Sequence, residues 1–523
     1  MRSAVCALTL LVLVRPALAQ PGPAAPPGDV QAEGEPAAPA EGAGPAAPID
    51  SAPAPVAVPP PVVVTTSTTT PSAAVPGDRG FRFGSYGRIV VGSDLRGGKP
   101  EGIKVVAVAP RVVEPSYFEL DFSMGFVTPR GLSIRPVMTV AFNSVLFHET
   151  GDFDAQPALR NLYLDAQITD RWSAWVGSRM YRGDDIYLLD YWPLDDQNTI
   201  GGGVLYRGAI GPGADPQRPD LLELAAHVGV NRLTTPFQLQ EIEVADPEQG
   251  ATTIVQLNRQ RMVASADAAY IHRGAPSALS YKAKLHGELH GLPAGARRRF
   301  LPDGSTGELE PLPADLGFLV GGELSLFGWH TGGFDRRHVN LYGRYARGLA
   351  AFDELAQPTS FGRDLKTSGA SELTFGTSTN WDADLGSVII GALARRFIDA
   401  DPAGEDPDDG WEYAVAVRPL ARVTQELSAG ADVSYQARFP RGLNPSTLRA
   451  EDPAVFQIAP MLVFSPIGKS SYDRPQLRLV YRAAYLNEGA LSLYAPADPR
   501  SERTWVHFLG FQAEWWFNST RYQ

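Results

Sequence analysis

Among the segments of this sequence that place an aromatic side chain two positions from a charged side chain, four are of chemical interest. The pairs are Tyr86 with Arg88, Tyr117 with Glu119, Tyr472 with Arg474, and Glu514 with Trp516. Residues two apart in a β-strand share a face, so each pair would place a flat apolar ring beside a charged hydrogen-bonding group. A sugar ring has an apolar patch of C–H bonds and a rim of hydroxyls, and such a pair suits both. Each pair could therefore hold such a ring weakly, provided that these segments are strands.

Alternation of apolar and polar residues indicates that they are strands. Residues 117–126 read YFELDFSMGF, residues 161–168 read NLYLDAQI, and residues 505–517 read WVHFLGFQAEWWF. A strand that crosses a membrane needs roughly 9–11 residues, with lipid on one face and water on the other. An aromatic end to the last strand is typical of outer-membrane barrels. Alternation alone also fits a strand of a soluble β-sandwich.

The paired aromatic residues fall on the polar faces of these strands. After Tyr472, the even positions Arg474, Gln476, Arg478 and Arg482 are polar. After Phe334, the even positions Arg336, His338, Asn340 and Arg344 are polar. An aromatic side chain on such a face has no lipid to contact, so we expect these rings to border a water-filled lumen.

The N-terminal segment predicts export. Residues 1–20 combine Arg2, a short apolar run and Ala-Leu-Ala, which is the pattern of a secretory signal peptide. Cys6 is the only cysteine and lies within this signal, so we expect a mature chain without disulfides. Residues 21–78 are rich in Pro and Ala and predict a disordered periplasmic tether. Residues 79–523 then form a single transmembrane β-barrel.

Composition excludes several classes of protein. The formal net charge of −12 argues against a nucleic-acid partner, which would need a basic face. The mean hydropathy of −0.13 is too low for a helical membrane protein. A transmembrane barrel has such a near-neutral average, because its apolar residues occupy every second strand position.

Several motifs resemble the maltoporins, the LamB-type carbohydrate porins. WVGSRMY at 175–181, followed by Asp185 and by DYW at 190–192, is similar to the third strand and inward-folded third loop of that family. SYDRPQLR at 471–478, WEYAVAVR at 411–418, FRFGSYGR at 81–88 and LGFQAEWWF at 509–517 resemble other family strands. The matches keep the family order from residue 81 to residue 517.

The resemblance implies an all-β fold with about 18 antiparallel strands, a homotrimer in the outer membrane of a Gram-negative-type cell, and passage of malto-oligosaccharides. It also implies a path of lumen aromatic residues flanked by charges. The aromatic positions carried over are Phe153, Tyr117, Tyr86, Trp516, Tyr472 and Phe334. The charged positions are Arg88, Arg111, Glu119, Arg160, Asp185 and Asp190, and Trp192 lies where the family has a constricting tyrosine.

Alternatives stay open at this point. A general porin, a porin selective for anions or peptides, and a surface protein without conductance share most of these features. A hydrolytic barrel is disfavoured because none of the eight histidines lies in a catalytic motif, and His286 and His290 only share a strand face. The acidic run 399–409 favours a solvated loop over a cation site. We therefore expect no catalytic residue, no metal and no cofactor, with oligosaccharide and membrane lipid as partners.

Overall fold

The computed structural model describes most of the chain after the predicted arm. The described residues are 79–143, 146–147, 151, 156–211, 219–231, 238–246, 251–275, 278–300, 306–329, 337–353, 356, 358–401, 407–445, 447–468 and 470–519. The predicted signal peptide and tether lie outside these ranges and stay predictions. No helix within the ranges is both long enough and apolar enough to span a membrane.

Eighteen antiparallel strands form one closed sheet, as the resemblance implied. The first nine are β1 (Gly80–Ser93), β2 (Tyr117–Val127), β3 (Ser133–Asn143), β4 (Gln156–Gln167), β5 (Trp172–Arg182), β6 (Asp196–Ala209), β7 (Leu221–Asn231), β10 (Arg261–His272) and β11 (Ser280–Leu292). The others are β14 (Asp315–Phe327), β15 (Arg337–Gly348), β16 (Ser371–Ala383), β17 (Gly386–Ile398), β18 (Gly410–Arg422), β19 (Leu427–Pro440), β20 (Ala454–Phe464), β21 (Gln476–Leu486) and β22 (Trp505–Phe517).

The connections hold the remaining elements. Two hairpins, β8 (Leu239–Asp246) with β9 (Ala251–Asn258) and β12 (Gly295–Phe300) with β13 (Thr306–Leu312), lie between sheet neighbours β7 and β10 and between β11 and β14. The short helices are η2 (Tyr187–Leu189), η3 (Leu349–Phe352), α1 (Glu488–Leu491) and η4 (Pro499–Glu502).

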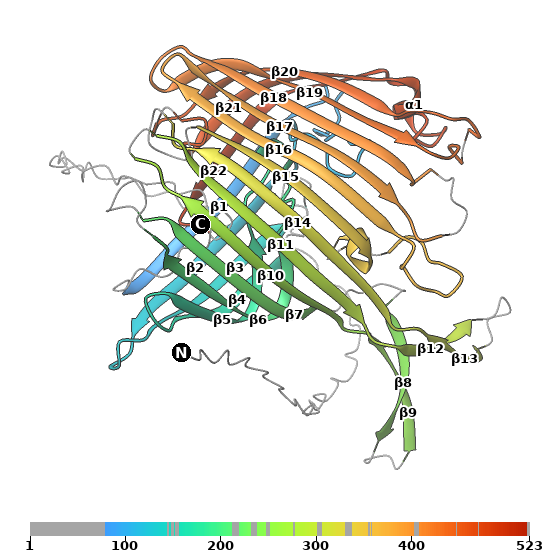
Figure 1. Cartoon of the computed structure of the whole chain (residues 1–523). Helices are drawn as coiled ribbons and strands as arrows, with labels where there is room; N and C mark the ends of the chain where they lie inside the picture. Colours follow the sequence, from blue (N-terminus) through green and yellow to red (C-terminus); the bar gives the residue numbers. More distant parts are fainter. Residues whose placement is uncertain are drawn as a thin grey trace, which may run out of the picture. The chain divides into compact units, whose positions relative to one another are not determined.

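Strands β1 and β22 close the barrel (Figure 1). Their antiparallel register pairs Tyr86 with Trp516 and Arg88 with Glu514. The first and last strands of the sheet therefore meet along a seam, and no strand of the sheet keeps an unpaired edge.

The strand faces divide as the alternation predicted. On β2, Met124 and Phe126 are exposed on the outside, whereas Glu119 and Asp121 are buried on the inside. On β22, Phe511 is exposed on the outside and Glu514 is buried inside. This division follows from the solvent on each side, since a charge facing the hydrocarbon costs about 2–4 kcal/mol near the bilayer midplane.

Two long connections fold into the barrel and form an apolar core there. The connection between β1 and β2 contributes Ile103 and Val105, and the connection between β5 and β6 contributes Ile186 and Leu188. The Arg111 amide donates to the Leu188 carbonyl at 2.8 Å, so the two connections are joined. The resemblance implied an inward fold only for the second of them.

Side chains of the barrel wall hold the first connection in place. The Gln436 side chain accepts from the Val105 amide at 2.9 Å and donates to the Ile103 carbonyl at 2.9 Å. Arg482 donates to the Glu101 carbonyl at 2.7 Å. These bonds satisfy backbone groups that would otherwise be buried without partners.

Candidate binding site in the barrel lumen

The register around the seam brings predicted site residues together on the lumen face. One row across β2, β1, β22 and β21 holds Tyr117, Arg88, Glu514 and Gln476 as successive register partners. The next row holds Glu119, Tyr86 and Trp516. Residues far apart in the sequence thus become neighbours, because the first and last strands pair.

Predicted aromatic residues form a line along this wall. Tyr117 and Tyr86 have ring centroids 6.1 Å apart, and Tyr86 is the register partner of Trp516. Tyr472 follows in the turn before β21, rather than in the strand itself. Phe153 and Phe334 lie outside the described residues, so their places in the line stay predictions.

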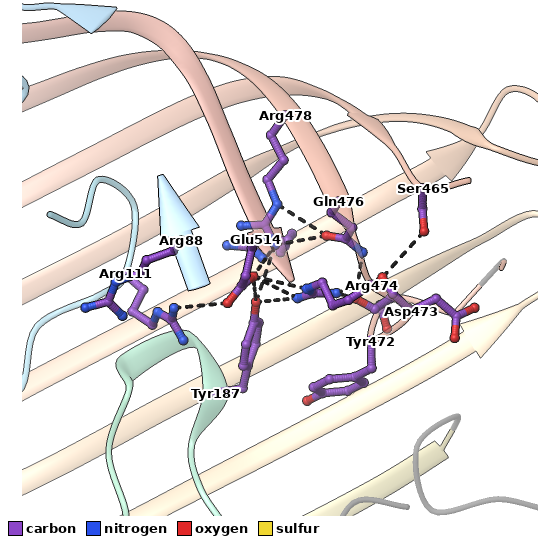
Figure 2. Close-up of polar contacts among 12 residues, drawn as sticks. Arg88, Arg111, Tyr187, Ser465, Tyr472, Asp473, Arg474, Gln476, Arg478 and Glu514 are labelled. Atoms are coloured by element: carbon purple, nitrogen blue, oxygen red, sulfur yellow. Dashed lines mark hydrogen bonds and ion pairs between the residues drawn. The ribbon is translucent and has the colours of Figure 1, made fainter. Parts of the chain in front are cut away.

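Tyr187, on the short helix η2, joins the two parts of this line. Its ring lies edge-on to Tyr472 and to Trp516, at centroid distances of 5.4 and 6.3 Å. Its hydroxyl donates to Glu514 Oε2 at 2.7 Å and accepts from Arg474 at 2.5 Å (Figure 2). The sequence singled out the residues around Tyr187 but not Tyr187 itself.

Glu514 is the centre of the charged cluster around these rings (Figure 2). Its carboxylate accepts from Arg111 at 3.2 Å, from Arg478 at 2.7 Å and from Arg474 at 3.1 Å. A buried carboxylate without a partner would destabilise the fold, and here three guanidinium groups compensate its charge. The position of Glu514 two residues before Trp516 was the only sequence signal for this role.

The expectation that the aromatic faces border water is wrong for three of them. Tyr86, Tyr472 and Trp516 are only 0%, 6% and 9% exposed. Alternation identified the lumen face correctly, but it could not show that the connections fold inward and cover that face. Tyr117 remains partly exposed.

A β-bulge explains how Arg160 reaches the lumen. On β4, Leu162 and Leu164 face outward, so regular alternation would turn Arg160 toward lipid. The register instead shifts between Thr139 and Val140 of β3, opposite Arg160, and the extra residue points inward. There Arg160 forms an ion pair with Glu119 and donates to the Tyr117 hydroxyl at 2.6 Å.

Charged residues of strand β1 and of the two connections meet beside this cluster. Arg88 contacts Asp190 at 3.3 Å and Glu114 at 2.9 Å. Arg111 contacts Asp190 at 3.8 Å and also pairs with Glu114. Burial alone would lower the pKa of Arg111, but the nearby carboxylates outweigh it and hold that pKa well above its usual value.

Both ends of the connection between β5 and β6 are fixed to β11. Asp184 forms an ion pair with Lys282, and Asp195 lies 2.6 Å from Lys284. Burial would raise the pKa of Asp184, yet the charge and hydrogen bond of Lys282 lower it to about 2. Sequence reasoning missed both lysines, although they alternate with Ala283 and Leu285 on their strand.

The other predicted residues of this connection have different surroundings. Trp192 is buried, and the Arg182 guanidinium carbon lies 3.8 Å from its ring centroid. The Asp185 carbonyl accepts a hydrogen bond from the Tyr342 hydroxyl at 3.4 Å. A constricting role for Trp192 and a ligand-binding role for Asp185 stay predictions.

A cavity of about 1040 Å³ is lined in part by the two inward-folded connections. Its lining includes Arg111, Asp190, Tyr191, Arg344 and Glu372. The volume is at the upper end of ligand pockets, which span roughly 300–1,000 Å³. The cavity therefore has room for a ligand of several linked rings beside Arg111 and Asp190.

The histidine pair and the acidic run have structural partners. His286 and His290 share the lumen face of β11, as predicted, and both bond to Glu288, at 2.8 and 2.7 Å. At the ends of the acidic run, Asp399 and Asp409 are buried, and the Asp399 amide donates to the Asp409 carboxylate at 2.7 Å, so these ends are not solvated. Within the described ranges, no group of three metal-ligating side chains suits a metal ion.

A comparison with known protein families gives a match for the C-terminal part of the chain. The LamB porin family model matches residues 313–517. No curated protein sequence matches the chain. Among solved structures, the chain is similar to the outer membrane channel DcaP of Acinetobacter baumannii, at 12% identity and a TM-score of 0.34, over 85% of this chain and 100% of that one.

Two further solved structures are similar to the chain. One is Wzi of Escherichia coli, described as a carbohydrate-binding β-barrel, at 10% identity and a TM-score of 0.37, over 83% of each chain. The other is OprB of Pseudomonas putida, at 10% identity and a TM-score of 0.35, over 84% of this chain and 94% of that one.

The family match spans the strands from β14 to β22, which include the seam strand and the turn that carries Tyr472. The barrel is closed, with 18 strands, and its apolar side chains face outward. Residues 313–517 thus match the LamB porin family model, and the closed barrel is that of an outer-membrane porin.

Proposed function

We propose that this porin passes sugars by facilitated diffusion, and malto-oligosaccharides in particular. The observation that carries the proposal is the line of rings Tyr117, Tyr86, Trp516 and Tyr472, in which each ring lies beside a charged hydrogen-bonding group. The other residues that we propose to contact the sugar are Phe153, Phe334, Arg88, Arg111, Glu119, Arg160, Asp185, Asp190 and Trp192.

The two kinds of group would divide the work of binding. A ring face covers the C–H patch of a pyranose, and the charged groups exchange hydrogen bonds with its hydroxyl rim. Transport requires binding that is loose enough for release, and a row of equivalent weak sites meets that requirement. The cavity beside Arg111 and Asp190 would admit the sugar to the end of the row.

The Tyr187 side chain occupies part of the proposed sugar path. Its ring lies against Tyr472 and Trp516, and its hydroxyl bonds to Glu514 and Arg474, where a sugar would make the same kinds of contact. A sugar that contacts Trp516 or Tyr472 must therefore displace the Tyr187 ring. Since both ends of this connection are held by lysines, we expect the side chain to move rather than the backbone.

Planar-bilayer recording tests the proposal. Linear malto-oligosaccharides should block the open channel of the full-length protein in a saturable way. Tyr117→Ala should weaken the block about fivefold, which corresponds to a loss of about 1 kcal/mol of ring contact. Tyr345→Ala removes a tyrosine from the outer face of β15 and should leave the block unchanged.

The main alternative is a porin selective for anions or peptides. Block by anions or peptides, with none by a panel of neutral oligosaccharides, would replace the sugar assignment and leave the porin assignment intact. We also propose a homotrimer without catalytic activity. Native mass spectrometry of the detergent-extracted protein tests the trimer, and a monomer would contradict it.

A further inference from the structure

Arg179 on β5 differs from most arginines of the lumen. Arg344, Arg418 and Arg478 each form an ion pair with a carboxylate, at 2.6, 2.5 and 2.7 Å. Arg179 has neither an ion pair nor a hydrogen bond to its side chain among the residues that the structure describes. It is also partly exposed, and it shares the lumen face of β5 with the buried Trp175.

Three aromatic rings surround the Arg179 guanidinium. Its central carbon lies 5.0 Å from the Tyr163 ring centroid, 5.3 Å from that of Trp175 and 5.2 Å from that of Tyr181. Such contacts stabilise the charge without using its N–H donors, because they act through the faces of the rings. The cage therefore positions the group and leaves its hydrogen-bonding capacity available.

The surrounding strands make room for this cage. Gly203 of β6 is the register partner of Trp175, and a Cβ atom at Gly203 would lie 2.6 Å from the indole nitrogen. His227 of β7 is the next register partner in this row; its ring stacks on Trp175 at 5.2 Å and is held by Thr199 at 2.7 Å. Gly203 and His227 thus fix the indole, which in turn fixes one wall of the cage.

We propose that Arg179 is an anion-binding site in the channel, which takes a carboxylate or phosphate group of a passing solute. A guanidinium presents donors in a planar fork that matches both groups bidentately. Tyr163 and Tyr181 border the same position, and neither hydroxyl has a hydrogen-bond partner among the described residues. Both hydroxyls therefore keep their donor capacity.

This inference goes beyond the proposed function, because the aromatic line suits a neutral sugar and Arg179 adds affinity for acidic solutes. The favoured solute class is a sugar or small organic molecule that carries one anionic group. Binding at Arg179 does not require displacement of Tyr187, whose contacts involve other residues. The two proposals can therefore fail independently.

The test compares glucose with glucuronate, which differ by one carboxylate, as blockers of the full-length channel in planar bilayers. Glucuronate should bind on the order of tenfold more tightly than glucose in the wild-type channel. Arg179→Met should abolish the difference. Arg179→Lys, which keeps the charge but loses the fork, should keep only part of it.

The control variant is Arg396→Met. It removes the same charge from an exposed position on the outer face of β17, and should leave the difference intact. Equal binding of both sugars by the wild-type channel, or a difference that survives Arg179→Met, would overturn the proposal. Should Arg179→Met fail to assemble, competition in the wild-type channel decides: inorganic phosphate should relieve the glucuronate block, and a block insensitive to phosphate would overturn it.

Discussion

The Lys284 ammonium group lies 2.6 Å from the Asp195 carboxylate, and this contact ties one end of the connection between β5 and β6 to strand β11. Lys282 ties the other end through Asp184. Tyr187 lies between the two attachments and meets the aromatic line. The barrel wall thus determines where the Tyr187 ring can be.

Lys284→Met should loosen this connection. The substitution leaves Asp195 buried beside Asp267 without their shared cation, and removal of one partner of a buried pair costs about 3–5 kcal/mol. We expect a lower urea midpoint of unfolding and larger current fluctuations in the open channel. Adding Asp195→Asn should recover part of both effects, and a quiet channel of normal stability in the single variant would contradict the role of the pair.

Tyr187→Ala should open the channel at the aromatic line. The native ring is 2% exposed and fills the space against Tyr472 and Trp516, so its removal should raise the sugar-free conductance severalfold. Tyr187→Phe keeps the ring and should stay near the wild-type value. Tyr413→Ala, on the outer face of β18, serves as the control for loss of a tyrosine.

Chemical rescue gives a second measurement for Tyr187. Cys6 is the only cysteine and lies in the predicted signal peptide, so Tyr187→Cys introduces a single thiol into the mature chain. Benzyl methanethiosulfonate should attach an aromatic ring there and lower the conductance again. The same reagent should not affect the wild-type channel. If neither the substitution nor the reagent changed the conductance, Tyr187 would not limit the pore.

Arg160→Ala should make the channel more selective for cations. Glu119 is almost completely buried and would lose the guanidinium that compensates its charge. Reversal potentials in a salt gradient measure the change, and the double variant Arg160→Ala/Glu119→Gln should return toward the wild-type value. An unchanged reversal potential in the single variant would show that the pair lies outside the ion path.

Leu285→Arg should destabilise the barrel from its lipid face. Leu285 lies near the middle of β11 and is 72% exposed on the outside, where an arginine costs about 2–4 kcal/mol. Leu309→Arg is the matched control, because Leu309 is 52% exposed on hairpin strand β13, outside the main sheet. Equal unfolding midpoints for the two variants in lipid vesicles would contradict the assignment of the lipid face.

The sequence identified the strand faces because apolar and polar residues alternate where a strand has lipid on one face and water on the other. Each strand borders lipid on one side and the lumen on the other, so Glu119 and Trp516 could be placed inward from their positions alone. Arg160 could not, because a bulge depends on the pairing with β3. The place of Tyr187 depends on contacts with β21 and β22, which no local pattern contains.

The seam between β1 and β22 also has a consequence for how the protein folds. Tyr86 and Glu514 are 428 residues apart and meet only when the first strand pairs with the last. Pairing across such a sequence distance is slow, since the entropy of bringing the chain ends together is lost before any contact compensates it. Until then both terminal strands keep unpaired edges, which promote aggregation. The aromatic line is therefore assembled in the final step of folding, and a sugar that binds it would report barrel closure directly.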